Sequence, residues 1–280
     1  MRAEIEVAGR KRSYQLITRT SADTQSRQET SAVLIFLHGS KQTGQSVREF
    51  AGNSIDQLAD NGHVAVVYPD GLQKRWNHNK NSSGSTNDVA FIESLADHFH
   101  GKYGPIPVII AGFSNGGQLV IRLIHENQEK FHGAAIIGAT LPRPGGLDFA
   151  DQLRPLPVLL IHGTSDLVVP YGGEGWFATF FGARRGPSAL KTAQYFAARN
   201  SISNPPLHEV LPHRKESGRT TVGLTRFEQD ALPSVWLYTV RGGGHVVPNR
   251  HRKAIFLAGR TTQDITTAQA LADFFPVLRK

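Results

Sequence analysis

The segment over residues 108–118 constrains the fold of this chain more than any other. An apolar, β-branched run over 108–111 leads into a Gly-x-Ser-x-Gly pattern centred on Ser114, and apolar residues at helical spacing follow. This order of strand, tight turn and helix is the context that a nucleophile elbow requires. Gly112 and Gly116 lack the Cβ atoms that would collide around a strained turn at Ser114. The pattern therefore predicts an exposed serine hydroxyl between a strand and a helix.

A glycine-rich loop with an incidental serine is the alternative interpretation of the same segment. A chain with 28 glycines produces Gly-x-Ser-x-Gly by chance fairly often. The flanking strand and helix favour the elbow, because the motif is informative only in that context. A helix that begins behind Ser114 would also direct the amide of Asn115 towards an oxyanion formed at the serine.

The rest of the chain alternates buried-strand patterns with amphipathic helical patterns. Runs of the strand type cover 32–37, 64–68, 133–138, 157–163, 220–227 and 235–240. Helical patterns cover 47–58, 88–99, 189–198 and 265–275. This alternation predicts an α/β fold with a mostly parallel sheet and helices on both faces. We expect a single domain over 1–280 without a large lid domain, in which residues 1–30 are a peripheral segment with an edge hairpin and a solvated loop.

Three loops that follow apolar strands carry the residue types that acyl transfer needs. Because active residues collect beyond the C-terminal ends of parallel strands, we expect Ser114, Asp166 and His245 to meet there. A serine hydroxyl is unreactive at neutral pH until an imidazole accepts its proton, and the imidazole needs a carboxylate that holds its tautomer. We assign the nucleophile to Ser114, the base to His245 and the orienting acid to Asp166. Their chain order is the one typical of α/β-hydrolases.

Other side chains fit these roles less well. His38 and His162 lie in His-Gly dipeptides at strand ends, where a buried hydrogen-bonding role is expected. Three aspartates precede a strand or lie in a turn: Asp148, Asp151 and Asp230. The structural alternative for Asp166 is that it braces the loop before Val168, and a structural role is the alternative for His245 as well.

Two polar loops complete the expected site. Ser40 follows the 32–37 strand, and its amide would be the second oxyanion donor beside that of Asn115. A plain strand-end turn is the alternative. Trp76 lies in the polar loop over 72–86, where a large ring needs an apolar contact. Its ring would either pack the loop down or form the wall of a pocket, and the sequence leaves both interpretations open.

Several motifs occur in a characteristic order: Leu37-His38-Gly39-Ser40, Tyr68-Pro69-Asp70-Gly71, Trp76-Asn77, Asp88-Val89-Ala90-Phe91-Ile92, Gly112-Phe113-Ser114-Asn115-Gly116-Gly117, His162-Gly163-Thr164-Ser165-Asp166 with Val169-Pro170-Tyr171, and Gly242-Gly243-Gly244-His245. With them the chain, from about Ser31 onwards, resembles the polyhydroxybutyrate depolymerase and feruloyl esterase family of α/β-hydrolases. The resemblance implies the α/β-hydrolase fold, a triad of Ser114, Asp166 and His245, and an oxyanion hole formed by the amides of Ser40 and Asn115. It also suggests substrate-binding residues: Trp76, Asn77, Tyr171 and Val247.

The chain departs from this family at two positions. Members often have a cysteine where Ser40 stands and a tryptophan where Val247 stands. The substitution at Val247 removes a ring that would border the acyl or alcohol site. This change argues against the polymer and feruloyl specificities of the family. Because no separate polymer-binding domain or linker is visible in the sequence, we expect a small soluble ester, with a short-acyl, aryl or feruloyl, or 3-hydroxyalkanoate group, and not a crystalline polyester. The alternatives are a peptidase or thioesterase on the same fold, and a hydrolase-like binding protein without chemistry.

Composition argues against several other classes. The chain has no cysteine, which excludes disulfides, thiolate metal sites and a cysteine nucleophile. No group of histidines and carboxylates has metal-ligand spacing, so we expect neither a metal nor another cofactor. The net charge of +8 is scattered and no nucleic-acid fold signature accompanies it, so nucleic-acid binding is not expected. No membrane-spanning run or signal-like segment is visible, which indicates a cytoplasmic protein although members of the family are often secreted. The oligomeric state is left open.

Overall fold

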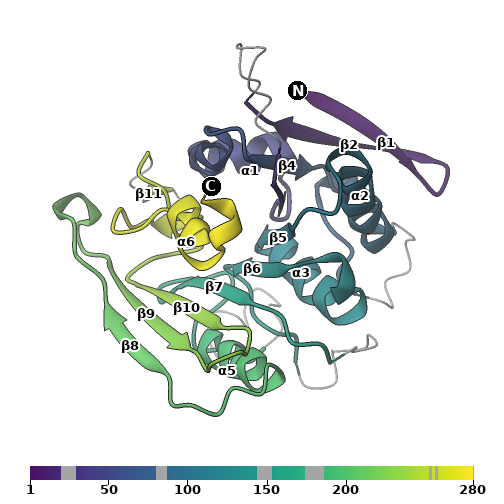
Figure 1. The fold of residues 1–280 in the computed structure, drawn as a ribbon. Coiled ribbons are helices and arrows are strands. Elements are labelled where there is room, and N and C mark those ends of the chain that lie inside the picture. The colour runs from purple at the N-terminus through teal and green to yellow at the C-terminus, as the bar shows by residue number, and fades with distance from the viewer. Residues whose placement is uncertain are drawn as a thin grey trace.

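A mostly parallel sheet forms the centre of the molecule (Figure 1). The computed structural model describes residues 1–19, 30–79, 87–143, 153–173, 186–251, 254–255 and 258–279. Within these residues ten strands form one sheet in the order β1-β2-β4-β3-β5-β6-β7-β10-β9-β8. The strands are β1 (Arg2–Val7), β2 (Arg10–Ile17), β3 (Ala32–Leu37), β4 (Val64–Pro69), β5 (Val108–Phe113), β6 (Gly133–Ile137), β7 (Val158–Gly163), β8 (Leu207–Val210), β9 (Thr221–Phe227) and β10 (Val235–Arg241). A separate two-stranded sheet pairs β11 (Ala254–Ile255) with β12 (Gly259–Arg260).

Six neighbouring strands in the middle of the sheet run parallel, in the order β4-β3-β5-β6-β7-β10. The two strands at each edge pair antiparallel with their neighbours. The parallel strands β3 to β7 are buried along their whole length. This burial on both faces is the reason that their sequences are continuous apolar runs. The predicted mostly parallel α/β sheet is confirmed.

Helices cover both faces of the sheet (Figure 1). One core lies under α2 (Asp88–Tyr103), α3 (Asn115–Glu126) and α5 (Ala189–Arg199). The other lies under α1 (Gly44–Phe50), a 3₁₀ helix (Ser54–Ala59) and α6 (Thr267–Phe274). Alternate residues of β3 belong to the two cores: Val33, Ile35 and Leu37 to the first, and Ala32, Leu34 and Phe36 to the second. No large lid domain occurs among the residues that the structure describes.

The helical pattern over 47–58 is two short helices and not one. Gly52 and Asn53 have φ angles of +63° and +53°, which belong to the left-handed region and end α1. The chain then resumes as the 3₁₀ helix Ser54–Ala59. The apolar side chains on either side of this break still face one core, which is why their spacing predicted a continuous helix.

The two edges of the sheet differ in how well the sequence predicts them. The expected N-terminal hairpin is present as β1 and β2, and β2 pairs with β4. The loop expected after it falls mostly on residues 20–29, which lie outside the described residues. The opposite edge strand, β8, gave no strand pattern because all four of its residues are exposed. None of the described helices is both long enough and apolar enough to cross a bilayer.

Candidate active site

Ser114 lies at the sharp turn between β5 and α3. Its backbone has φ +54° and ψ −117°, and a non-glycine residue in this region costs on the order of 1–3 kcal/mol unless its surroundings hold it there. The Ser114 amide is held by the carbonyl of Ile137 at 2.8 Å. A Cβ atom on Gly112 would lie 2.4 Å from the carbonyl carbon of Gly116. The glycines of the motif are therefore required by close backbone packing, as the elbow predicts.

His245 joins Ser114 to Asp166. Its Nε2 is 2.9 Å from Ser114 Oγ, and its Nδ1 is 2.6 Å from Asp166 Oδ2. Because a carboxylate only accepts hydrogen bonds, the imidazole proton lies on Nδ1 and Nε2 is left to accept the serine proton. Ser114 is half-buried, whereas His245 is 9% and Asp166 4% exposed. The three side chains that the sequence predicted to meet are in contact, with the hydroxyl at the more open end.

Asp166 also fulfils the structural alternative. Its Oδ1 accepts hydrogen bonds from the amides of Val168 and Val169, each at 2.8 Å. The carboxylate therefore braces its own loop with one oxygen and holds His245 with the other. Both functions are compatible because the two oxygens face different partners.

His162 lies beside this acid as a buried neighbour. Its Nε2 is 2.7 Å from the carbonyl of Val169 and 3.5 Å from Asp166 Oδ2. Burial lowers the pKa of His162, an effect that the nearby Asp166 charge only partly offsets. Like His38, it has the buried hydrogen-bonding environment that its position at a strand end predicted. Of the rival acids, Asp230 is exposed, and Asp148 and Asp151 lie outside the described residues.

An aromatic pair next to His245 was missed by the sequence reasoning. The ring centroid of Phe113 lies 4.7 Å from that of His245, and the half-buried Phe50 stacks on Phe113 at 5.4 Å. Gly138 has φ +58°, and a Cβ atom there would lie 3.1 Å from the Phe113 ring and 3.3 Å from His245. The position of Phe113 directly before Ser114 could have identified it from the sequence. The contact between Phe113 and Phe50, which lies at the end of α1, is visible only in the fold.

The two predicted oxyanion donors follow neighbouring strands of the sheet, β3 and β5. Ser40 is exposed in the turn after β3, and Asn115 is the first residue of α3, whose amide has no acceptor within the helix. Within the described chain, neither amide hydrogen bonds to a protein acceptor. The loops approach closely, because a Cβ atom on Gly116 would lie 2.5 Å from the carbonyl oxygen of Leu37 and 2.6 Å from that of His38.

Trp76 is packed into the core and does not form the wall of an open pocket. It is 2% exposed, and its ring contacts those of His38 and Phe91 at centroid distances of 4.7 and 6.5 Å. Its Nε1 donates to the carbonyl of His38 at 2.9 Å. These contacts correspond to the packing alternative, since a buried ring has no free face for a substrate. The neighbouring Asn77 is half-buried, and its amide donates to Asp88 Oδ2 at 2.8 Å.

Val247 lies in the core, whereas Tyr171 packs beside His162 at a ring-centroid distance of 5.9 Å. Val247 is completely buried, because the chain after His245 passes beneath the start of α6. There the carbonyl of Pro248 accepts from the Thr267 amide at 2.9 Å. The expected place of Val247 at the substrate is therefore corrected to a place in the core. Tyr171 is half-buried, and its hydroxyl is 2.9 Å from the Thr239 hydroxyl.

The described residues also include a surface cavity apart from the predicted site, and they include no metal cluster. Among the described residues, no group of three or more histidine, cysteine, aspartate or glutamate side chains is placed to hold a metal ion. A surface cavity between the 3₁₀ helix and α6 is lined by residues that include Gln57, Arg250 and Thr266, and it contains none of the predicted site residues.

Proteins that are similar to this chain include several named as esterases. A family model described as "Phospholipase/Carboxylesterase" matches residues 72–182. "Putative esterase NocK" of Nocardia uniformis subsp. tsuyamanensis is 27% identical over 289 residues, covering 97% of this chain and 81% of that protein. "Lysophospholipase-like protein 1" of Mus musculus is 28% identical over 162 residues, covering 50% of this chain and 68% of that protein.

Two solved structures have a similar fold. The acetyl xylan esterase from Aspergillus awamori has a TM-score of 0.57 at 13% identity, covering 90% of this chain and 96% of that one. The LpqC poly(3-hydroxybutyrate) depolymerase from Bordetella parapertussis has a TM-score of 0.52 at 18% identity, covering 88% of this chain and 85% of that one. At these identities the likeness concerns the architecture of the chain.

Proposed function

We propose that this chain is a serine carboxylesterase of the α/β-hydrolase superfamily, whose chemistry is carried by Ser114, His245 and Asp166. The observation that carries the proposal is the continuous hydrogen-bonded series from Asp166 Oδ2 through His245 to Ser114 Oγ, at 2.6 and 2.9 Å. This series has the protonation pattern that a nucleophilic serine requires.

The reaction would proceed in two acyl transfers. Ser114 Oγ attacks the ester carbonyl while its proton passes to His245 Nε2, and the imidazolium that forms is stabilised by Asp166. His245 then returns the proton to the leaving alcohol, and the acyl group remains on Ser114. A water molecule, deprotonated by His245, attacks the acyl-enzyme, and His245 returns this proton to Ser114 Oγ as the acid leaves. The amides of Ser40 and Asn115 would stabilise the oxyanion in both steps.

The proposed substrate is a small soluble ester. The relatives and the similar structures are named for ester hydrolysis, including acetyl xylan and 3-hydroxybutyrate esters. Short-acyl, aryl or feruloyl, and 3-hydroxyalkanoate oligomer esters are the classes to compare. The half-buried Phe50, stacked on Phe113 beside His245, supports an apolar contact for the acyl or alcohol part.

The test combines active-site labelling with a substrate panel. The purified protein should be labelled by a fluorophosphonate at Ser114 and should hydrolyse at least one of the three ester classes. Ser114→Ala should abolish labelling and lower turnover by about 10⁶-fold while the protein stays folded, because removing the nucleophile of a serine hydrolase has an effect of that size. Near-native turnover by the folded variant would exclude the assignment.

The same panel separates the alternatives. Faster turnover of thioesters or peptides than of any ester would indicate a thioesterase or peptidase on this fold. Absence of labelling and of turnover would indicate a binding protein that has the fold without the chemistry.

A further inference from the structure

Two consecutive peptide groups after β3 have three of their four polar atoms held by side chains. In the first, the carbonyl of His38 accepts from Trp76 Nε1 at 2.9 Å and the amide of Gly39 donates to Gln42 Oε1 at 2.8 Å. In the second, the carbonyl of Gly39 is 2.7 Å from His38 Nδ1. The fourth atom is the N–H of Ser40, the expected oxyanion donor. The Gly39 carbonyl also accepts from the Gln42 amide, at 3.3 Å, so the shorter contact with the His38 ring and this turn bond together orient the peptide plane that carries the Ser40 N–H.

The protonation of His38 follows from its other nitrogen. His38 Nε2 lies 2.9 Å from the amide of Gly71, and a backbone N–H only donates. Nε2 must therefore be unprotonated, so the single ring proton is on Nδ1 and points at the Gly39 carbonyl. Burial lowers the pKa of His38 and so favours this neutral form.

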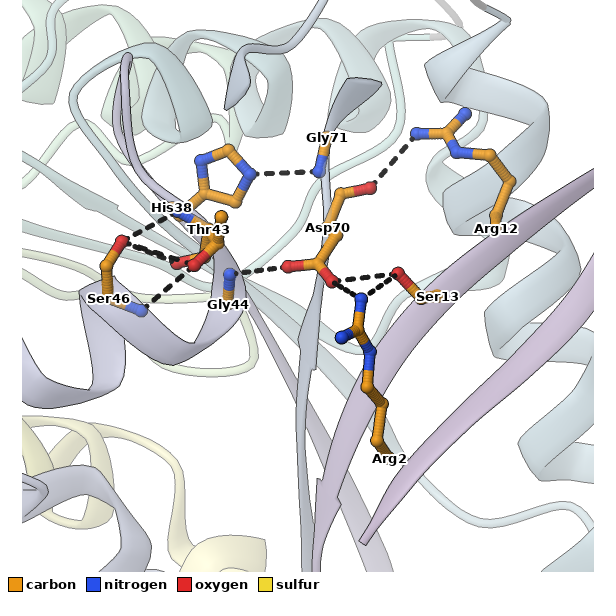
Figure 2. A network of polar contacts seen from close by, with 9 residues as sticks. All are labelled: Arg2, Arg12, Ser13, His38, Thr43, Gly44, Ser46, Asp70 and Gly71. Atoms are coloured by element: carbon orange, nitrogen blue, oxygen red, sulfur yellow. Dashed lines mark hydrogen bonds and ion pairs between the residues drawn. The ribbon is translucent and has the colours of Figure 1, made fainter. Parts of the chain in front are cut away.

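The turn that holds the His38 ring is itself anchored, as Figure 2 shows. The Asp70 carboxylate accepts from the Gly44 amide and from the Ser13 hydroxyl, each at 2.8 Å. The Asp70 amide donates to the Ser13 carbonyl at 2.9 Å. The Gly71 N–H is thus fixed between the N-terminal hairpin and the start of α1, and so is the ring that accepts from it.

Trp76 connects this loop to the second expected donor. The Asn115 side chain pairs with the backbone of Trp76, accepting from its amide at 2.7 Å and donating to its carbonyl at 3.1 Å. The Trp76 ring packs against His38 at a centroid distance of 4.7 Å. Trp76 is thus bonded both to the loop that carries the Ser40 amide and to Asn115 at the start of α3.

We propose that His38 and Trp76 are positioning residues that orient the Ser40 N–H towards the oxyanion, an inference that rests on the esterase function proposed above. The C=O and N–H of a trans peptide point in opposite directions, so fixing the Gly39 oxygen fixes the Ser40 N–H. A preorganised donor stabilises the transition state more than the ground state. Losing the orientation should therefore lower kcat and leave KM nearly unchanged.

Two substitutions at His38 separate its hydrogen bonds. The amide nitrogen of asparagine is as many bonds from the backbone as Nδ1, so His38→Asn can keep the donor to Gly39. Glutamine reaches as far as Nε2, so His38→Gln can keep the acceptor for Gly71 and loses the donor to Gly39. We expect His38→Gln to lower kcat by about 10- to 100-fold, less than the roughly 10²- to 10³-fold loss on deleting an oxyanion donor. His38→Asn should stay within about fivefold of the wild type.

A matched control substitution is available in α3. His125 is also buried, and its Nδ1 likewise lies near a backbone carbonyl, that of Ile121 at 2.6 Å, in the last turn of the helix. His125→Gln should lower thermal stability without lowering kcat. Trp76→Phe, which keeps a ring and removes Nε1, is a second variant in case His38→Gln does not fold. We expect it to lower kcat by about tenfold.

The measurements are kcat, KM and the affinity for a trifluoromethyl ketone, which forms an oxyanion adduct with a nucleophilic serine. The affinity should fall by the same factor as kcat in His38→Gln and Trp76→Phe. The proposal is wrong if folded His38→Gln keeps wild-type kcat and ketone affinity, or if His38→Asn loses as much as His38→Gln. A wild-type protein that neither turns over esters nor binds the ketone would instead refute the esterase function itself.

Discussion

Replacing Asp166 by asparagine should disable His245 without unfolding the protein. The substitution conserves shape, but it converts one acceptor into a donor. Oδ1 of Asp166 accepts from two backbone amides, those of Val168 and Val169, so the asparagine oxygen must occupy that position. The new NH₂ group then replaces Oδ2, which faces His245 Nδ1 at 2.6 Å. The orientation of the amide is therefore determined by the loop.

The NH₂ group reverses the polarity of the contact with the imidazole. His245 Nδ1 has to accept, so the ring proton moves to Nε2, which then faces Ser114 Oγ and cannot take its proton. The same change in a serine protease triad lowers kcat by about 10⁴-fold. We expect a similar loss here, equivalent to about 5.5 kcal/mol of transition-state stabilisation.

The assay measures kcat and KM on the best ester of the panel, together with thermal unfolding. The midpoint of unfolding should stay close to that of the wild type, because both backbone amides keep their acceptor. Asp166→Ala is the comparison variant, and it should also lose stability because it leaves those two amides without a partner. If Asp166→Asn retained kcat within tenfold, the carboxylate would not be setting the tautomer and the assigned role of Asp166 would be refuted.

Three further predictions follow from packing and burial. Gly116→Ala places a Cβ atom 2.5 Å from a backbone carbonyl oxygen and should lower the free energy of unfolding, measured in denaturant titrations, by about 1–3 kcal/mol. Gly101→Ala is the control, because its Cβ atom meets nothing within 4 Å, and it should raise the free energy of unfolding by about 0.5–1 kcal/mol. Burial lowers the pKa of His38 and His162, so the unfolded chain binds protons that the folded chain does not. The free energy of unfolding should therefore fall as the pH drops below about 6.5, by at most about 1.4 kcal/mol per pH unit for each histidine. An unfolding midpoint independent of pH between 7 and 5 would contradict this. Val247→Trp should reduce the yield of folded protein without shifting ester preference, since the side chain is completely buried, and a stable variant with a new substrate preference would refute that placement.

The residues proposed to carry the chemistry could be predicted from the sequence, because each follows a strand that is apolar along most of its length. The elbow around Ser114 is a local structure: a strand, a strained turn that needs flanking glycines, and a helix. Asp166 and His245 were found through a general property of parallel sheets, whose carboxyl ends lie at one edge. No side-chain contact had to be known to expect that these loops would converge.

The substrate-binding residues were less accessible to the same reasoning. Trp76 and Val247 follow the correct strands, but position along the chain does not say whether a side chain points outwards or into the core. Their burial depends on Phe91 from α2 and on the start of α6, segments that are distant in sequence. Phe50 was missed for the opposite reason, because only the fold brings the end of α1 against Phe113.

The sequence by itself therefore determined the α/β architecture, the succession of strands and helices along the chain, and the expectation that Asp166 and His245 meet Ser114. These follow from hydrophobic periodicity, glycine geometry and proton chemistry, which act over a few neighbouring residues or along the whole sheet. Only the tertiary structure decided which oxygen of Asp166 holds His245 and which nitrogen of His38 carries its proton. Those choices depend on single hydrogen bonds between segments far apart in the chain, and a shift of one ångström in either segment would change them.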